Sequence, residues 1–208
     1  MPRATGIAVQ RLNPRHRSNI TYQLLQLPAE DRRLRFGRHI RDEAIRAYVA
    51  GIDFERDRVF GIQGGALELT GVAHLALDRP HQTAELGLSV LPSERGRGYG
   101  FALLQRSVLY AANRGYGALF MYCLAENGIM IHLARKAGLS VVVEAGEADA
   151  RLKLDRHAHG GAFAEAVADQ FALVDSILKQ QYLWLAQPRS VHEVPARQRG
   201  EGARAGVG

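Results

Sequence analysis

The sequence lacks the features expected of an oxidising compartment or a membrane. It contains one cysteine, Cys123, which excludes an internal disulfide framework and suits a reducing compartment. No stretch approaches the roughly 18 consecutive apolar residues that a membrane-spanning helix needs. The first residues, MPRATGIAVQRLNPRHR, lack the apolar centre and the small-residue cleavage site of a secretory signal. We therefore expect a cytoplasmic protein without membrane partners.

The sequence also lacks a basic excess in its central part. The net charge is +6, but residues 1–18 carry four arginines and no acid, and residues 187–208 carry four arginines against two glutamates. These two ends account for the whole excess, and residues 19–186 are neutral. A nucleic-acid-binding domain carries its basic surface on the fold itself. The charge distribution therefore argues against a nucleic-acid partner.

Composition divides the chain into four parts. We expect residues 1–18 to be a flexible segment, residues 19–155 to form one domain, and residues 187–208, rich in Pro, Gly and Arg, to be a disordered tail. Residues 161–186 are predicted to form a long helix. Its apolar residues recur at steps of four and three, namely Phe163, Val167, Phe171, Val174, Leu178, Tyr182 and Leu185. This stripe either packs on its own domain or forms the seam of a homodimer.

Hydrophobic periodicity and turn residues predict a mixed α/β domain. A first strand precedes helices, a run of antiparallel strands follows, and helices and strands then alternate. The predicted helices are a region that opens at Pro28, then Arg41–Gly51, Tyr99–Asn113 and Gly128–Ala137. The predicted strands are Ile20–Leu27, Arg58–Gln63, Leu67–Leu77, Ala84–Leu91, Ala118–Leu124, Ser140–Glu144 and Ala148–Leu154.

The most informative segment lies between a predicted strand and a predicted helix and reads Arg95-Gly96-Arg97-Gly98-Tyr99-Gly100. Glycines let the backbone approach a bulky anion, and the first-turn N–H groups and the helix dipole attract it. The two arginines add positive charge, so the segment predicts a pyrophosphate site. It is not a P-loop, because no Lys-Ser or Lys-Thr pair follows. It is not a dinucleotide fingerprint either, because Phe101 stands where the third glycine belongs.

Two sequence blocks resemble the signature of the GNAT (GCN5-related N-acetyltransferase) superfamily. The glycine segment matches R-x-x-G-x-G between a strand and a helix, and residues 127–139 (NGIMIHLARKAGL) match N-x-x-[AM]-x-x-[LI]-x-x-K-x-G-[FL]. The upstream segments LPAEDRRLRF (27–36), GIDF (51–54) and GVAHL (71–75) are similar to the GNAT domain of bacterial protein-lysine acetyltransferases. The resemblance covers residues 20–154.

The resemblance implies a mostly antiparallel, splayed sheet flanked by helices. It also implies an enzyme that needs no metal and moves an acetyl group from acetyl-CoA directly to a primary amine, for which a protein lysine is one acceptor. A small-molecule amine is the alternative acceptor, and a closed pocket lined by Asp53 and Glu55 would favour it. A non-catalytic sensor that only binds acyl-CoA is a further alternative.

The same resemblance implies roles for individual residues. Glu85 is expected to be the general base, with a pKa raised by partial burial, and His74 on the adjacent strand is a weaker alternative. The coenzyme loop is Arg95–Gly100. Backbone groups of the next strand segment are expected to meet the thioester oxygen and the pantetheine, and these belong to Leu88, Ser89 and Val90.

Three further positions are open at this stage. Asn127 either contacts the coenzyme or simply caps the end of a strand. Gly87 is expected to help its strand diverge from Ala118–Leu124. The tyrosine that many GNAT enzymes use to protonate the departing thiolate is replaced by Ala134, and Tyr122 or Tyr110 are candidates to take its place.

Overall fold

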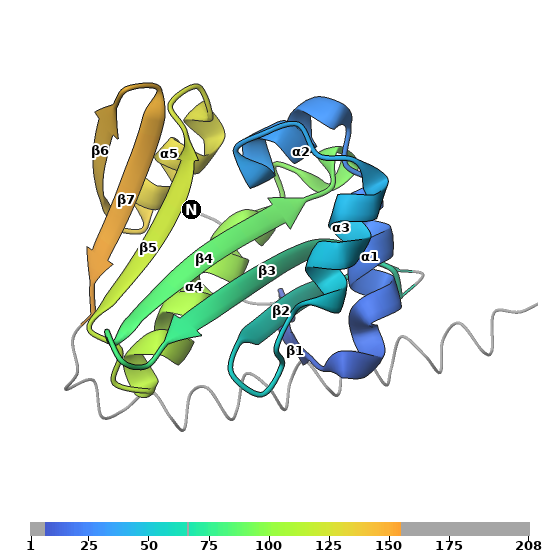
Figure 1. Cartoon of the computed structure of the whole chain (residues 1–208), viewed down its shortest axis with the longest axis horizontal. Coiled ribbons are helices and arrows are strands. Elements are labelled where there is room, and N and C mark those ends of the chain that lie inside the picture. Colours follow the sequence, from blue (N-terminus) through green and yellow to red (C-terminus); the bar gives the residue numbers. More distant parts are fainter. Residues whose placement is uncertain (1–6, 66, 155–208) are drawn as a thin grey trace, which may run out of the picture.

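A computed structural model describes residues 7–65 and 67–154, and this part of the chain forms an open seven-stranded sheet (Figure 1). The strand order is β1-β2-β3-β4-β5-β7-β6, and all neighbouring strands are antiparallel except β4 and β5, which are parallel. The predicted mixed α/β fold with a mostly antiparallel sheet is confirmed. The strands are β1 Gln10–Leu12, β2 Arg58–Gln63, β3 Leu69–Asp78, β4 Thr83–Val90, β5 Ala118–Leu124, β6 Ser140–Glu144 and β7 Glu147–Lys153.

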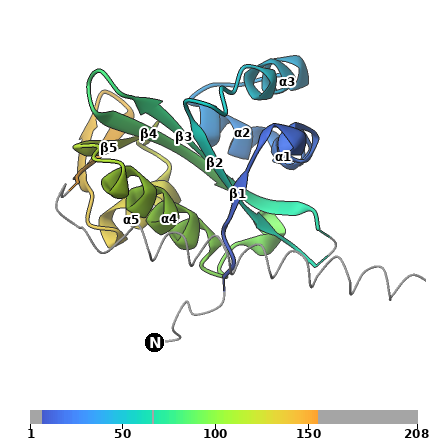
Figure 2. The same ribbon diagram turned by 90° about the horizontal axis from the view of Figure 1, so that it is seen from below.

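Helices cover both faces of the sheet. Figure 2 shows α1, α2 and α3 on one side of the sheet and α4 and α5 on the other. None of the helices in the described part of the chain has the length and apolarity to span a membrane. The helices are α1 Arg17–Leu25, α2 Ala29–Phe36, α3 Asp42–Ala50, α4 Tyr99–Asn113 and α5 Gly128–Lys136, with short 3-10 turns at Pro14–His16 and Pro92–Glu94.

Alternation along the central strands divides the apolar side chains between two cores. Phe60 of β2 packs in the same cluster as Leu103 of α4. Its neighbour Val59 belongs to the other cluster, together with Ile45 of α3. Successive strand residues point to opposite faces, so a sheet covered on both sides needs apolar residues at consecutive positions. The central strands are therefore packed on both faces, which fixes the position of the residues at their ends.

The predicted strand Ile20–Leu27 is wrong, because residues 17–25 form the helix α1. Ile20, Gln23 and Leu24 are buried at helical spacing, whereas the side chain of Tyr22 is 60% exposed. A strand would have placed Ile20 and Tyr22 on the same face. Packing against α3 and β3 thus overrides the strand preference of the Ile-Thr-Tyr run.

The expectation that residues 1–18 form a flexible segment is wrong for residues 10–18. Gln10–Leu12 is strand β1, which pairs with β2 and places Leu12 opposite Val59. Arg17 donates hydrogen bonds to the carbonyl oxygens of three residues at the end of α3, namely Val49, Ala50 and Ile52. The reason is that Leu12 covers the apolar edge of the sheet, where it is 2% exposed. The predicted helix 161–186 and the tail 187–208 lie outside the described residues.

We expect Leu12→Ala to lower the free energy of unfolding by about 2–5 kcal/mol, because a buried leucine is truncated in a packed site. Arg11→Ala, at the exposed neighbouring position, should change it by no more than about 0.5 kcal/mol. Urea unfolding of both variants makes the comparison. Equal effects would show that β1 contributes no packing energy to the domain.

Candidate active site

The parallel pairing between β4 and β5 ends after three residue pairs. The last pair joins Glu85 to Phe120, whereas β4 stays paired with β3 as far as Val90. Beyond Glu85, the backbone edge of β4 that faced β5 therefore lacks a strand partner among the described residues. Buried backbone groups need partners, so this edge is available to a ligand. The splayed sheet that the sequence predicted is present, with its fork at Glu85.

A cleft of about 430 Å³ occupies the fork. β5 contributes Tyr122 and Cys123 to its walls, and α5 contributes Met130 and Leu133. A slot with apolar walls that leads to a glycine loop suits a long, flexible arm with an anionic end. Nine of the ten predicted coenzyme-binding residues line the cleft, namely Leu88, Ser89, Val90, Arg95, Gly96, Gly98, Tyr99, Gly100 and Asn127.

The glycine loop has the geometry of an anion site. Gly96 and Gly98 adopt left-handed φ angles of +77° and +83°, which glycine tolerates without steric cost. Gly98 is the N-cap of α4, and its carbonyl oxygen accepts the hydrogen bond of Ala102. The N–H groups of residues 99–101 come before this first helical hydrogen bond and therefore have no acceptor within the helix. Together with the helix dipole, they favour a phosphate at this point.

The loop arginines are already paired with acidic side chains. Arg95 lines the cleft but forms an ion pair with Asp31 at 2.8 Å. Arg97 pairs with Glu94 at 3.1 Å and is the one predicted coenzyme-binding residue outside the cleft lining. A cation that sequence reasoning missed near this loop is Lys136, which lines the cleft and lies 4.9 Å from the centre of the Phe101 ring. Its position in the Asn127–Leu139 block was the available signal.

Ser89 and Asn127 line the cleft, but their side chains already form hydrogen bonds within the protein. The Ser89 hydroxyl donates to the Gln23 side-chain oxygen at 3.1 Å, which leaves the backbone of Ser89 for a ligand. Asn127 is the N-cap of α5 and accepts a hydrogen bond from the Met130 amide at 3.2 Å. Its amide nitrogen faces the carbonyl oxygen of Leu34 at 3.5 Å. Asn127 therefore shapes the cleft by joining α5 to α2.

Glu85 lies in a second cavity beside the cleft. This hollow of about 680 Å³ is lined by Glu85, Phe120 and Tyr122, together with residues of the β3–β4 turn. Glu85 is exposed, so the partial burial expected from the sequence is wrong. The reason is its place at the edge of the fork, where none of the helices described by the structure covers it. Tyr122 lines both the cleft and the hollow and forms the wall between them.

The two tyrosines considered as replacements for the acid missing at Ala134 have different surroundings. Tyr110 is 2% exposed, its hydroxyl accepts a hydrogen bond from Arg58 at 2.6 Å, and it does not line the cleft. Tyr122 does line the cleft. Burial raises the pKa of the Tyr122 hydroxyl, and the charges of Asp149 and Glu85 raise it further. Tyr122 therefore carries a proton at neutral pH, next to the point where the strands part.

A chain of polar side chains runs from the interior to the cleft. His74 Nε2 lies 3.1 Å from Asp57 Oδ2, and His74 Nδ1 lies 2.6 Å from the Tyr48 hydroxyl oxygen. That oxygen accepts a hydrogen bond from Arg35 at 3.2 Å. With a neutral imidazole, Tyr48 donates to His74, which in turn donates to Asp57. Both ring nitrogens of His74 are engaged, so it is badly placed as a base for an acceptor.

The pKa values of His74 and Asp57 favour a neutral His74 that donates a hydrogen bond to an ionised Asp57. Burial lowers the pKa of His74 from its ordinary value of 6.5, and the hydrogen bond and charge of Asp57 oppose this only in part. Burial would raise the pKa of Asp57, but the hydrogen bonds that it accepts from Arg56, Leu77 and then His74 lower it overall. At neutral pH the pair is a neutral imidazole beside an ionised carboxylate.

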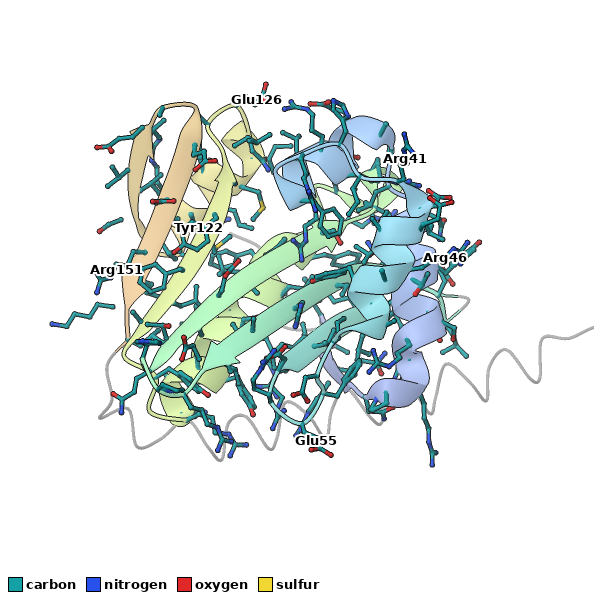
Figure 3. The ribbon with its side chains drawn as sticks, viewed as in Figure 1. Arg41, Arg46, Glu55, Tyr122, Glu126 and Arg151 are labelled. Carbon is teal, nitrogen blue, oxygen red and sulfur yellow. The ribbon has the colours of Figure 1, made fainter. Side chains whose placement is uncertain are left out.

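Asp53 and Glu55 line neither the cleft nor the hollow. Glu55 lies in the loop before β2 with an exposed side chain (Figure 3), and Asp53 accepts hydrogen bonds from the amides of Glu55 and Arg56 in that loop. A closed pocket lined by these two residues would have favoured a small-molecule amine, and neither cavity at the fork provides it. Within the described residues, no group of three or more His, Cys, Asp or Glu side chains is placed to hold a metal ion.

We expect the His74 environment to make stability depend on pH. The folded pKa of His74 lies below the unfolded value, so the unfolded chain binds the proton first as the pH falls. Its contribution to stability is present above pH 6.5 and is lost below it. The decrease in unfolding free energy between about pH 7.5 and about pH 5.5 should be smaller in His74→Gln than in the unsubstituted protein. Urea titrations measure it, with His39→Gln, at an exposed site, as the control that keeps the original slope.

Known proteins agree with this geometry. A model of the acetyltransferase (GNAT) family matches residues 21–139, whereas no curated protein matches the chain. The GNAT domain of PAT from S. lividans has a TM-score of 0.61 at 19% identity and covers 70% of this chain and 89% of its own. For yncA from Salmonella typhimurium, solved with acetyl-CoA, the TM-score is 0.56 at 20% identity, and the match covers 74% of this chain and 97% of that one. For RimL, the ribosomal L7/L12 α-N-protein acetyltransferase solved with coenzyme A, the TM-score is 0.57 at 16% identity, with coverages of 74% and 98%.

The solved structures share the fold at low identity, and the family model carries the assignment. It spans more than half of the chain and includes the fork, the glycine loop and α5. The chain belongs to the GNAT family and is an N-acetyltransferase.

Proposed function

We propose that the enzyme transfers the acetyl group directly to a primary amine at the fork between β4 and β5, with Glu85 as the general base. The observation that carries this proposal is the position of Tyr122, which borders both the cleft with the glycine loop and the hollow with Glu85. The thioester and the amine then approach the same point from two sides. No nucleophile of the enzyme is needed between them.

In this proposal the cleft binds the coenzyme. The leftover amides of residues 99–101 bind the diphosphate, and Lys136 and Arg95 supply charge beside it. The unpaired edge of Leu88–Val90 binds the amide groups of the pantetheine arm, as a neighbouring strand would. The apolar side chains of Met130 and Leu133 cover its carbon atoms. Acetyl-CoA supplies a thioester that can be attacked at its carbonyl carbon.

Residues at the fork perform the proton transfers. An alkylamine with a pKa of about 10.4 is charged at neutral pH, so Glu85 must remove a proton, directly or through one water. As the N–C bond forms, backbone N–H groups of Leu88–Val90 stabilise the charge on the carbonyl oxygen. As the C–S bond breaks, the Tyr122 hydroxyl donates its proton to the sulfur. After the C–S bond breaks, the nitrogen still carries one proton more than an amide, and this proton returns to the Tyr122 oxygen. The products are then an amide and a free thiol, with Tyr122 neutral and one proton on Glu85.

The acceptor belongs to one of two classes. The resemblance of segments 27–36, 51–54 and 71–75 to protein-lysine acetyltransferases favours a lysine side chain. The structure offers one observation in favour of a small amine, namely the cation Arg35 in the wall of the cleft.

We expect Glu85→Gln to reduce kcat by about 10²–10⁴-fold, because the amide cannot accept the proton of the amine. Its affinity for acetyl-CoA should not change, since Glu85 lies outside the cleft. Acetyl-CoA consumption with a panel of amines and with native and denatured protein lysates provides the rate.

Glu147→Gln, an exposed change on β7, serves as the control for the Glu85 variant. Full activity of Glu85→Gln would remove Glu85 from the mechanism. An unsubstituted enzyme that binds acetyl-CoA and acetylates no amine would favour the sensor instead.

The glycine loop yields a second test. A Cβ at Gly100 would make ordinary contacts of 3.5 Å or more with Leu133, Leu88 and Val90, so Gly100→Ala should still bind coenzyme A. Gly100→Asp places a negative charge in the first turn of α4, which stabilises the helix but repels a diphosphate.

We therefore expect coenzyme A to raise the melting temperature of the unsubstituted and Gly100→Ala proteins but not that of Gly100→Asp. The melting temperature without ligand should not fall in Gly100→Asp. Stabilisation of all three proteins by coenzyme A would place the diphosphate elsewhere.

A further inference from the structure

Arg35 of α2 lies against β4 just beyond the fork. It lines the cleft, and a Cβ at Gly87 would overlap its guanidinium group. Gly87 is thus free of a side chain because Arg35 fills that space. Sequence reasoning attributed this glycine to strand divergence and missed the arginine, which carries no motif of its own.

The guanidinium group is held in place by aromatic and polar contacts. Its carbon lies 4.9 Å from the centre of the Phe36 ring and 5.9 Å from that of Tyr48. It donates a hydrogen bond to the Tyr48 hydroxyl, which His74 and Asp57 fix from the interior. Cations favour such aromatic faces, and the buried chain sets their orientation. Arg35 is therefore presented to the cleft in a defined geometry.

Arg35 differs from its neighbours on α2 in having no acidic partner within residues 7–65 and 67–154. Arg32 pairs with Asp42, and Arg33 pairs with Glu30 and Glu126. Arg35 forms no ion pair with any described residue, although it is half-buried. A guanidinium stays charged at all relevant pH values and has five N–H donors. Its hydrogen bond to Tyr48 leaves most of these donors for an anion in the cleft.

Arg35 and the first turn of α4 lie on opposite faces of β4. Gly87 faces Arg35, whereas the side chain of the next residue, Leu88, points to the other face, where a Cβ at Gly100 would lie 3.9 Å from it. Glu85 is two residues before Gly87 on the face of Arg35, at about 7 Å. Tyr122 also lines the cleft at this end. The free cation therefore stands where the acetyl group and the acceptor meet.

We propose that Arg35 binds a carboxylate of the acceptor, and that the acceptor is a small amino carboxylic acid. The inference rests on the proposed acetyl transfer and names its substrate class. Arg35 forms a two-pronged pair with the carboxylate, and this pair holds the amine of the same molecule towards Glu85. A polyamine, or a lysine without an acid beside it, instead meets an unpaired positive charge.

The test compares each amino acid with its own carboxamide as acceptor, so that only the carboxylate changes. We expect the enzyme to prefer the best acid over its amide by about 10- to 100-fold in kcat/KM. Arg35→Met keeps the length and apolar contacts of the side chain. It should abolish this preference by raising the KM for the acid. Turnover of the amide should stay as it was. Gly87→Ala, which displaces the guanidinium without removing its charge, should give the same pattern.

Arg38→Met removes an equal charge from an exposed site just after α2 and should leave the preference intact. Equal losses for acid and amide in Arg35→Met would assign Arg35 to the carbonyl oxygen or to folding and overturn the proposal. An unsubstituted enzyme without preference for the acid, or one that acetylates only protein lysines, would overturn it as well.

A binding measurement separates this proposal from the proposed function. N-acetyl amino acids and their amides are titrated by calorimetry into the enzyme loaded with coenzyme A. Tighter binding of the acids to the unsubstituted protein but not to Arg35→Met supports the carboxylate site, even if no amine is acetylated. Equal binding of acids and amides overturns the site whether or not the enzyme turns over.

Discussion

The site exists because a ladder of hydrogen bonds stops in the middle of the sheet. β4 keeps its partner β3 to its last residue, and β5 keeps its partner β7 along its whole length. Each strand is therefore stable without the other beyond Glu85 and Phe120, where their own pairing ends. The exposed edge of β4 has the hydrogen-bonding capacity of a missing strand. The coenzyme binding, the proton transfer and the selection of the acceptor that we propose all depend on this gap.

The parts of the site that sequence reasoning found are those with local causes. Two glycines at left-handed φ and the start of a helix form the anion loop from adjacent residues, and α4 begins and ends where the periodicity predicts it. The residues that were missed owe their roles to distant parts of the chain. Arg35 approaches β4 from a different helix, and the segment after Ile20 becomes helical because its apolar face packs between α3 and β3.

The loop shows that basic residues in a motif need not be ligands. Arg95 and Arg97 both turn to acidic side chains of their own chain, so backbone N–H groups remain the constant feature of the anion site. The linked side chains of Asp57, His74 and Tyr48 show that residues of catalytic types need not perform catalysis. Their hydrogen bonds are satisfied among themselves and serve to orient a side chain at the surface of the cleft.

No residue of α2 is fully buried, and ion pairs join the helix to two other parts of the cleft. Asp31 joins it to the glycine loop through Arg95, and Arg33 joins it to Glu126 before α5. Dissolved salt weakens ion pairs at the surface, because the Debye length is about 10 Å at 0.1 M and becomes shorter as the salt concentration rises. We therefore expect ionic strength to act through α2 on both the coenzyme site and the acceptor site that we propose, so that their affinities should be compared at one buffer composition.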